Sequence, residues 1–329
     1  MNFDGTVISS VLPPVPIKAD LRAAQFKAAA NPKVKFKIAK AIVQAKIARS
    51  LQILDWLAER YDIEREVRLV KKQSLGLESA RTVVEIRSVE GRVAAKYWDA
   101  YGKVLPEALD FQGRMTSSHQ NDATDPVNAA LNYGYGVLEG ECRRVINAVG
   151  LEPSVGFLHD FSNYQTKQSL VYDLQELFRW IVDLTVMKAF ESGALDLSYF
   201  YFTGDDYRYR FDVEAKTRFI GLLREQFNSG ADYRGRILKW DTVIEQKAME
   251  LSRYLTEGLS VPDFAEPFPI LERRDNTNLR NRILSLTQSD AARVGIGKST
   301  LHYLRTRARN KGSMRTYHKV TTRIAHLDP

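Results

Sequence analysis

A long stretch beginning at residue 35 repeats its apolar side chains every three or four positions. The repeating positions are Phe36, Val43, Ile47, Leu51 and Leu54. This spacing places apolar side chains on one face of an α-helix, and that face must then be covered by other elements. Residues 62–104 continue the pattern, with Gly76 and Gly91 as expected breaks between amphipathic helices. The sequence therefore predicts a mainly α fold.

Other helices are indicated by the residues at their ends. Asp125-Pro126 is typical of a helix start and Gly150 of a helix end, so we expect a helix over 126–149 after a polar loop at 114–125. Further helices are expected at 169–191, 212–228 and 235–257, and a short hairpin at 198–211.

The chain of 329 residues has room for about two domains. Near the N-terminus, Asp4-Gly5 predicts a short hairpin over 2–10, and the prolines of LPPVP then interrupt regular structure. We expect a β-hairpin remnant and linker at 1–34, a helical domain at 35–258, a Pro-rich linker at 259–275 and a basic tail at 276–329.

The tail contains GIGKST at 295–300, which resembles the phosphate-binding loop of an ATPase. The strict pattern requires a glycine where this chain has Ala292. Such a loop also follows a buried strand, whereas the residues upstream, SLTQSDAAR, are polar and have helix-start signals. We therefore expect no ATP site.

The same letters fit a helix-turn-helix better. Thr287 or Ser289 caps a short first helix, Gly295 supplies the turn, and 298–309 forms the second helix. The inward positions are Ala291, Ile296, Leu301 and Leu304.

Basic residues on the second helix favour contact with DNA. We expect Lys298, Arg305, Arg307 and Arg309 to face solvent and to bind DNA. Residues 273–329 hold 13 Lys and Arg against three acidic residues, in a chain whose net charge is +8. Phosphate contacts from such a patch make affinity fall steeply with salt. The alternative is a basic two-helix element that only packs.

Several classes of protein are disfavoured. Cys142 is the only cysteine, so we expect neither a disulfide framework nor a cysteine-based zinc site. No run of 18 apolar residues occurs, and the N-terminus lacks the order of a signal peptide. We expect a soluble, cytoplasmic protein that does not associate with a membrane.

Two acidic residues lie on apolar stripes. Glu141 has Leu138 and Val145 at helical spacing, and Asp173 has Leu170 and Leu177. An ionised carboxylate on a buried face is costly unless it is paired or bound to a cation. His159 lies between them in sequence, and two carboxylates with an imidazole suit Mg²⁺ or Mn²⁺. The alternatives are a salt bridge for each acid and a packed histidine.

The central part of the chain resembles a known family. The matching pieces are Phe111-x-Gly113-Arg114, Asp125-Pro126-x-Asn128-Ala129, Asn132-Tyr133-Gly134-Tyr135, Glu141, Gly156-Phe157-Leu158-His159, Ser169-Leu170-x-x-Asp173-Leu174 and Phe178-Arg179. Together they resemble the CRISPR-associated integrase family, the metal-dependent nuclease of spacer acquisition, with its transposon relatives, the casposases. The resemblance covers about residues 1–258.

The resemblance implies a helical, metal-dependent integrase domain at 35–258. Its catalytic metal ligands fall on Glu141, His159 and Asp173, and it implies Mg²⁺ or Mn²⁺ as cofactor. Asp160 or Glu176 is a candidate for a further carboxylate. Arg179, Arg143 and Tyr133 are candidate DNA contacts, although each also fits a salt bridge or the core. Removing a ligand is expected to relieve buried charge and so raise thermal stability without metal.

Three functions remain open. The first is CRISPR spacer integration into double-stranded target DNA, with a small CRISPR-associated partner protein. The second is a casposase using the same chemistry, and the third is a non-catalytic DNA-binding protein. Because the β-rich dimerisation domain of the family is represented here only by a hairpin, we expect a weak dimer, or a homo-oligomer assembled on DNA.

Overall fold

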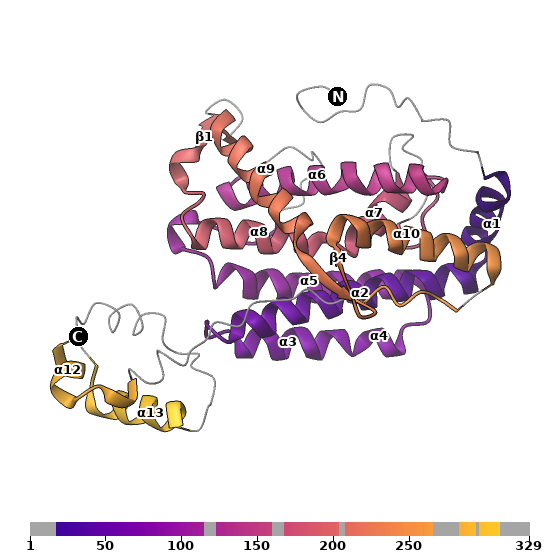
Figure 1. The fold of residues 1–329 in the computed structure, drawn as a ribbon. Coiled ribbons are helices and arrows are strands. Elements are labelled where there is room, and N and C mark those ends of the chain that lie inside the picture. Colours follow the sequence, from indigo (N-terminus) through magenta and orange to yellow (C-terminus); the bar gives the residue numbers. More distant parts are fainter. Residues whose placement is uncertain are drawn as a thin grey trace.

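The computed structural model describes residues 18–114, 123–159, 168–203, 208–258, 260–265, 283–293 and 296–309. Most of these residues are helical, and Figure 1 shows the long helices stacked in layers, as the mainly α prediction requires. The helices are α1 (Ala19–Ala30), α2 (Pro32–Ala58), α3 (Glu64–Ser74), α4 (Gly76–Ser79), α5 (Val83–Gly102), α6 (Pro126–Val149), α7 (Ser169–Glu176), α8 (Arg179–Glu191), α9 (Val213–Asn228), α10 (Trp240–Glu257), α12 (Gln288–Arg293) and α13 (Lys298–Arg309), with short 3-10 turns at Glu107–Leu109 and Leu197–Tyr199.

The helix that carries Glu141 begins and ends where its sequence predicts. Asp125 caps α6 by accepting a hydrogen bond from the Asn128 backbone N–H at 2.7 Å, and Pro126 occupies the first turn. Gly150 ends the helix in the left-handed conformation, with φ of 92°.

Two expected helix boundaries are wrong. Gly91 lies inside α5, which a capping box of Thr82 and Glu85 starts and whose apolar side is buried, so the glycine does not break it. The expected helix 169–191 divides into α7 and α8 at Leu177 and Phe178. Both of these side chains are buried, so the chain bends without leaving the core.

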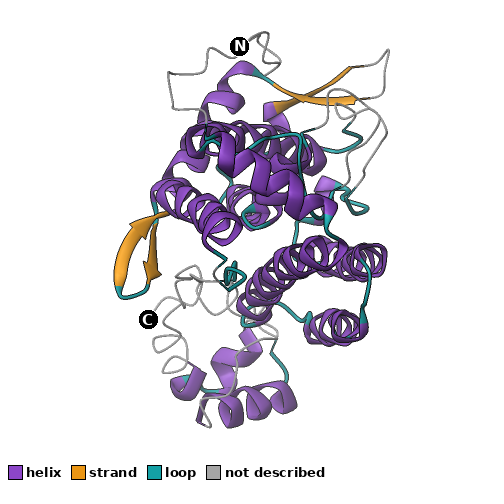
Figure 2. Cartoon of the chain, turned by 90° about the vertical axis from the view of Figure 1, so that its right-hand side faces the viewer, coloured by secondary structure: helices purple, strands orange, loops and turns teal. Residues whose placement is uncertain are grey.

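Two β-hairpins flank the helices (Figure 2). The expected one pairs β1 (Phe200–Thr203) with β2 (Arg208–Phe211) in antiparallel register. The second pairs β3 (Gly230–Tyr233) with β4 (Arg236–Lys239), in a region where we expected the start of a helix. Its turn places Arg234 and Gly235 at positive φ, and β4 then occupies the residues up to Lys239, so α10 begins only at Trp240.

The N-terminal expectation is partly corrected. Residues 19–30, within the segment expected to be hairpin and linker, form helix α1, and α2 starts before residue 35. The predicted hairpin at 2–10 lies outside the described residues. No helix among the described residues is long and apolar enough to cross a membrane.

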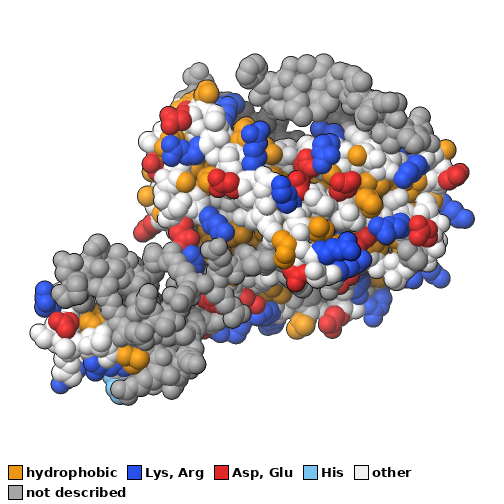
Figure 3. All heavy atoms as spheres, in the orientation of Figure 1, with side chains coloured by type: hydrophobic (Ala, Val, Ile, Leu, Met, Phe, Trp, Pro, Cys, Tyr) orange, Lys and Arg blue, Asp and Glu red, His pale blue; other side chains and the backbone are white. Residues whose placement is uncertain are grey.

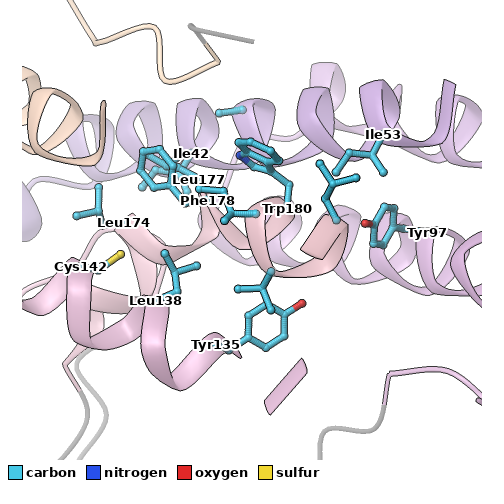
Figure 4. Packing of buried hydrophobic residues seen from close by; sticks show 14 of the residues in the cluster. Ile42, Ile53, Tyr97, Tyr135, Leu138, Cys142, Leu174, Leu177, Phe178 and Trp180 are labelled. Atoms are coloured by element: carbon cyan, nitrogen blue, oxygen red, sulfur yellow. The ribbon is translucent and has the colours of Figure 1, made fainter. Parts of the chain in front are cut away.

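The core lies where α6, α7 and α8 meet α2 and α5. Figure 4 shows Leu138 and Cys142 of α6 facing Leu174 and Leu177, with Ile42 of α2 behind them. Cys142 is fully buried, and burial raises the pKa of its thiol well above the usual value. This packing holds α6 and α7, which carry Glu141 and Asp173, against each other.

The tail forms two helices at the expected places. Ala291, Ile296, Leu301 and Leu304 are buried, as the helix-turn-helix pattern predicts, while Gly295 at the expected turn lies outside the described residues. The Ile296 N–H donates to the Ala291 carbonyl at 2.8 Å and closes the turn. Residues 288–293, upstream of GIGKST, form a helix rather than the strand that a nucleotide-binding loop follows.

Candidate metal and DNA-processing site

His159 and Asp173 form a pair between the connector after α6 and helix α7. The Nδ1 atom of His159 lies 2.7 Å from Oδ1 of Asp173. The Asp173 side chain is almost fully buried, whereas about a third of the His159 side chain (36 %) is exposed. The pairing fixes the imidazole ring and leaves its Nε2 edge for a ligand.

Backbone N–H groups surround the Asp173 carboxylate. Phe157 and Leu158 donate to Oδ2 at 2.5 and 3.0 Å, and His159 donates its own N–H to Oδ1 at 2.9 Å. With the imidazole, four donors occupy the acceptor positions of this one carboxylate. The buried Asp173 carboxylate is therefore stabilised by three consecutive backbone N–H groups and the His159 ring, a kind of compensation that the sequence alternatives of a metal ion or a salt bridge did not include.

The connector is held in place from α1. The side-chain amide of Gln25 donates to the carbonyls of Glu152 and Val155 at 3.0 and 2.7 Å and accepts from the Glu152 N–H. Gln25 is fully buried. Nothing in the sequence pattern singles out Gln25, since its role depends on a contact more than a hundred residues away.

Protonation of His159 is favoured by its neighbours. Burial opposes the charged form, but the hydrogen bond and charge of Asp173, helped by Glu176, raise the pKa of His159 above its usual value. A metal ion must displace that proton to bind the ring, so metal binding and acid compete at this residue.

Glu176 is a buried member of an ion-pair network, one turn after Asp173. Lys46 of α2 contacts it at 2.6 Å and Arg179 at 3.2 Å. Burial alone would raise the pKa of Glu176, but Lys46, then Arg179 and His159, lower it to about 2. Sequence reasoning missed Lys46, whose only signal was a charged side chain between the apolar positions Val43 and Ile47.

Glu141 is held apart from this pair. Its carboxylate accepts hydrogen bonds from Nε and Nη2 of Arg144, one turn further along α6, and a quarter of its side chain is exposed. The structure therefore places Glu141 on a half-buried edge and in a salt bridge rather than on a buried face. Asp160 lies outside the described residues.

The side chains of Glu141, His159 and Asp173 are of the types that bind a divalent cation, but the three do not lie together in this structure. Two carboxylates and one imidazole match the preferences of Mg²⁺ and Mn²⁺. Among the residues that the structure describes, no three His, Cys, Asp or Glu side chains lie close enough together to hold a metal ion. The structure pairs His159 with Asp173. That Glu141 binds the same metal ion as these two residues stays a prediction.

Comparison with known families decides the relationship. The family described as CRISPR associated protein Cas1 matches residues 1–225 of the chain. The chain belongs to the Cas1 family. Its resemblance to CRISPR-associated integrases, inferred from dispersed motifs, is thereby confirmed.

Two relatives show the extent of the Cas1 likeness. The CRISPR-associated endonuclease Cas1 1 of Archaeoglobus fulgidus is 31 % identical over 280 residues, which is 78 % of each chain. A protein of the same description from Methanospirillum hungatei is 29 % identical over 205 residues, or 60 % of this chain and 57 % of that relative.

Solved structures extend the comparison. A structure described as a casposase bound to integration product superimposes with a TM-score of 0.74 at 34 % identity, and covers 87 % of this chain and 78 % of the other. The Cas1 protein of Thermotoga maritima has a TM-score of 0.63 at 18 % identity over 74 % of this chain and 72 % of the other, which supports the fold alone.

The candidate DNA contacts in the Cas1-like domain have protein partners. Arg143 donates to Gln168 at 2.5 Å and pairs with Glu139, so it links α6 to the start of α7. Tyr133 packs its ring against Phe211 and Phe219 at 5.7 and 6.3 Å. The core alternative fits Tyr133 better, and Arg143 has a structural role whether or not it touches DNA.

Arg179 belongs to a buried network that sequence reasoning missed. Its guanidinium lies 4.0 Å from the Tyr135 ring centroid, and Arg114 lies over the same ring at 5.4 Å. The Tyr135 and Tyr97 hydroxyls donate to the Asp183 carboxylate. Burial raises the pKa of Asp183, against the opposing effect of these hydrogen bonds. The network ties α5, α6 and α8 together behind Glu176.

Of the four candidate DNA contacts in the tail, Arg305 departs from expectation. It is half-buried rather than solvent-facing, and it donates a hydrogen bond to the Leu286 carbonyl. Lys298 is exposed at the start of α13. Arg307 and Arg309 lie on α13, but their side chains are outside the described part of the structure.

Gly156 is the residue whose substitution tests the connector. A Cβ atom at this position would lie 2.8 Å from Ser169 and 2.9 Å from Asp173 Oδ2, closer than real contacts allow. We expect Gly156→Ala to push the connector away from Asp173 and to lower the free energy of unfolding by about 1–3 kcal/mol. Urea unfolding measures this change.

Gly136→Ala is the matched control, since nothing lies within 4 Å of a Cβ added to that exposed position of α6. It should leave stability unchanged or slightly raised, because alanine favours a helix. Equal stability of the Gly156 and Gly136 variants would contradict the close packing of the connector on Asp173.

Proposed function

We propose that this chain is a divalent-metal-dependent DNA integrase and endonuclease, which joins donor 3′-ends to double-stranded target DNA. The observation that carries the proposal is the His159–Asp173 pair: a partly exposed imidazole fixed by a buried carboxylate in a Cas1-family fold. A protein that only binds DNA has no need of an imidazole oriented in this way.

Mg²⁺ or Mn²⁺ would be held by Glu141, His159 and Asp173. When bound, the ion supplies positive charge against the developing charge on the phosphate oxygens. In the present arrangement Asp173 orients the His159 ring through Nδ1, and the backbone N–H groups of 157–159 hold Asp173. For Asp173 to bind the same ion as His159, its Oδ1 would have to exchange the Nδ1 contact for the ion. Glu141 would have to exchange its hydrogen bonds from Arg144 for the ion.

The proposed reaction is a transesterification. The donor 3′-oxygen forms a bond to a target phosphorus, the bond from that phosphorus to the target 3′-oxygen breaks, and a proton passes from the incoming to the outgoing hydroxyl. One phosphodiester bond is exchanged for another, so the reaction requires no ATP. Incubation of the purified protein with an oligonucleotide donor and a supercoiled plasmid, with joined product read on a gel, tests the proposal.

Two biological settings use this chemistry. CRISPR spacer integration with a small partner protein is the first, supported by the Cas1 endonucleases among the relatives. Casposase activity is the second, supported by the 34 % identity to the casposase structure over 87 % of this chain. Integration that requires a partner protein and a CRISPR repeat favours the first, whereas unaided integration of transposon ends favours the second.

We further propose that the protein acts in the cytoplasm as an oligomer assembled on DNA. Its tail would hold the target: Lys298, Arg307 and Arg309 would contact phosphates, and Arg305 would brace α13 against Leu286. The buried contacts between α12 and α13 fit both a DNA reader and the alternative of an element that only packs.

Deleting residues 276–329 tests the role of the tail. We expect the truncated protein to bind duplex DNA at least tenfold more weakly at 50 mM salt, because each lost phosphate contact lowers the slope of log K against log salt by about 0.9. The metal site should remain, so joining of donor to target at high DNA concentration should persist. Fluorescence anisotropy across a salt series measures the slope, and an unchanged slope would favour the packing alternative.

A further inference from the structure

A second concentration of positive charge lies at the other end of the chain. Residues 18–54 contain nine Lys and Arg and a single acidic residue, Asp20. This stretch forms α1 and most of α2. Basic and acidic side chains alternate over the face of the helical body in Figure 3, so the surplus is local rather than general.

The inward basic residues of this stretch are accounted for by the fold. Lys46 pairs with Glu90 and Glu176, and Arg22 pairs with Glu152 at 3.6 Å. Arg49 is buried, with its guanidinium 5.6 Å from the Trp240 ring centroid. These cations stabilise contacts between helices and are not presented to a ligand.

Three outward lysines have no such partner. Lys33, Lys37 and Lys40 follow one another at four- and three-residue spacing, so they form a row on one face of α2 about 10 Å long. Lys33 and Lys37 are exposed and Lys40 is half-buried over the Phe36 ring, at 5.9 Å. Within the described residues, none of the three forms a salt bridge with a carboxylate.

The row borders a concavity that the segment after α10 completes. Lys37, Lys40 and Gln44 line one side, and residues 261–265 line the other. Phe264 is buried in the core, and Lys247 donates to the Asp263 carbonyl at 2.7 Å, so this segment is fixed to the body.

The acidic group of the concavity is already engaged. Oδ1 of Asp263 accepts the Ala265 N–H at 2.9 Å, and its charge acts on the buried Arg49, whose pKa burial lowers to about 9 against the opposing effect of Asp263. Within the described residues, Asp263 forms no salt bridge with Lys37 or Lys40, so these lysines are not engaged by the acidic group of the concavity.

We infer that Lys33, Lys37 and Lys40 form a second DNA-binding surface, which contacts the phosphate backbone of duplex DNA. The inference rests on the proposed function. Lysines act on phosphate as point charges, and contacts to phosphate carry no sequence information.

The test replaces the row with Lys33→Gln, Lys37→Gln and Lys40→Gln together in the full-length chain. The probe is a labelled 30-base-pair duplex of random sequence, titrated from 50 to 300 mM KCl with EDTA present. We expect the slope of log K against log salt to become shallower by about 2–3, at about 0.9 for each lost contact, and affinity at 50 mM salt to fall at least tenfold.

The matched control is Arg65→Gln, Arg68→Gln and Lys72→Gln, which removes the same charge over the same seven-residue span from exposed positions of α3. For this control, the slope of log K against log salt should change by less than a third of the change expected for the variant that lacks the lysine row. An equal change in both variants, or an unchanged slope for the row variant, overturns the inference. So does loss of binding to anionic phospholipid vesicles with DNA binding intact, because the row would then recognise a lipid surface. Thermal unfolding of both variants should match the wild type.

The binding assay contains no metal and no reaction, so it separates this inference from the proposed function. If wild-type protein joins no DNA but the row variant still loses salt-dependent binding, the integrase proposal fails and the lysine surface stands. If strand transfer works and the row variant binds like the wild type, the lysine surface fails alone.

Discussion

Replacing His159 with alanine is expected to abolish strand transfer. Among the proposed ligands, His159 is already oriented for binding, because Asp173 contacts its Nδ1 at 2.7 Å and so fixes the direction of Nε2. A catalytic metal contributes several kcal/mol of charge stabilisation, and every 1.4 kcal/mol is tenfold in rate, so we expect a loss of about a thousandfold. Product formation in the plasmid assay measures it.

His302→Ala is the control, because His302 is an exposed histidine on α13 far along the chain from the site. It should keep joining donor to target. The proposal that His159 binds the metal would be contradicted by a His159→Ala variant that reacts at the wild-type rate under limiting Mn²⁺.

Replacing Asp173 with alanine is expected to destabilise the metal-free protein strongly. The substitution leaves the N–H groups of Phe157, Leu158 and His159 without their acceptor in a site where Asp173 itself is fully buried. Each orphaned buried donor costs about 1–3 kcal/mol, and these costs are not additive, so we expect about 3–5 kcal/mol less free energy of unfolding. Urea unfolding in EDTA measures the change.

This direction reverses what the sequence suggests. From the apolar neighbours of Asp173 alone, removing its charge should relieve strain and raise stability without metal. Asp173→Asn keeps one acceptor oxygen and should lie between alanine and the wild type. A metal-free Asp173→Ala protein as stable as the wild type would show that the N–H groups do not depend on this carboxylate.

The parts of the fold that sequence predicts well are those set by local chemistry. The bounds of α6 follow from Asp125, Pro126 and Gly150, which act on backbone groups within one turn. The helix over 212–228 and the hairpin before it follow from similar local signals. Gly91 misled because a glycine costs a helix interior only about 1 kcal/mol, which the buried apolar side of α5 outweighs.

Tertiary contacts decided the rest. The stretch 169–191 is apolar on nearly every side, so its periodicity gives no sign of the bend at Leu177 and Phe178. The β3–β4 hairpin is closed by Arg234 at positive φ, an unusual position for a residue with a side chain.

The candidate site shows the same division. Family motifs led to His159 and Asp173, and the structure brings these two together. The N–H groups that hold Asp173 and the amide of Gln25 that holds the connector come from backbone conformation and distant packing. Glu141 lies on α6 as expected, but it forms a salt bridge with Arg144. The i, i+3 spacing of these two residues is typical of such a pair, and this signal was not used in the sequence analysis.

Strand transfer with and without divalent metal tests the central claim most directly. The reaction holds purified full-length protein, a labelled oligonucleotide donor with a 3′-hydroxyl and a supercoiled plasmid, with Mn²⁺, Mg²⁺ or EDTA, and with or without ATP. We predict joined product with either metal, none with EDTA or with a 3′-deoxy donor, and no effect of ATP. Product formed in EDTA, or a reaction that requires ATP, would contradict the assignment of this chain as a metal-dependent integrase.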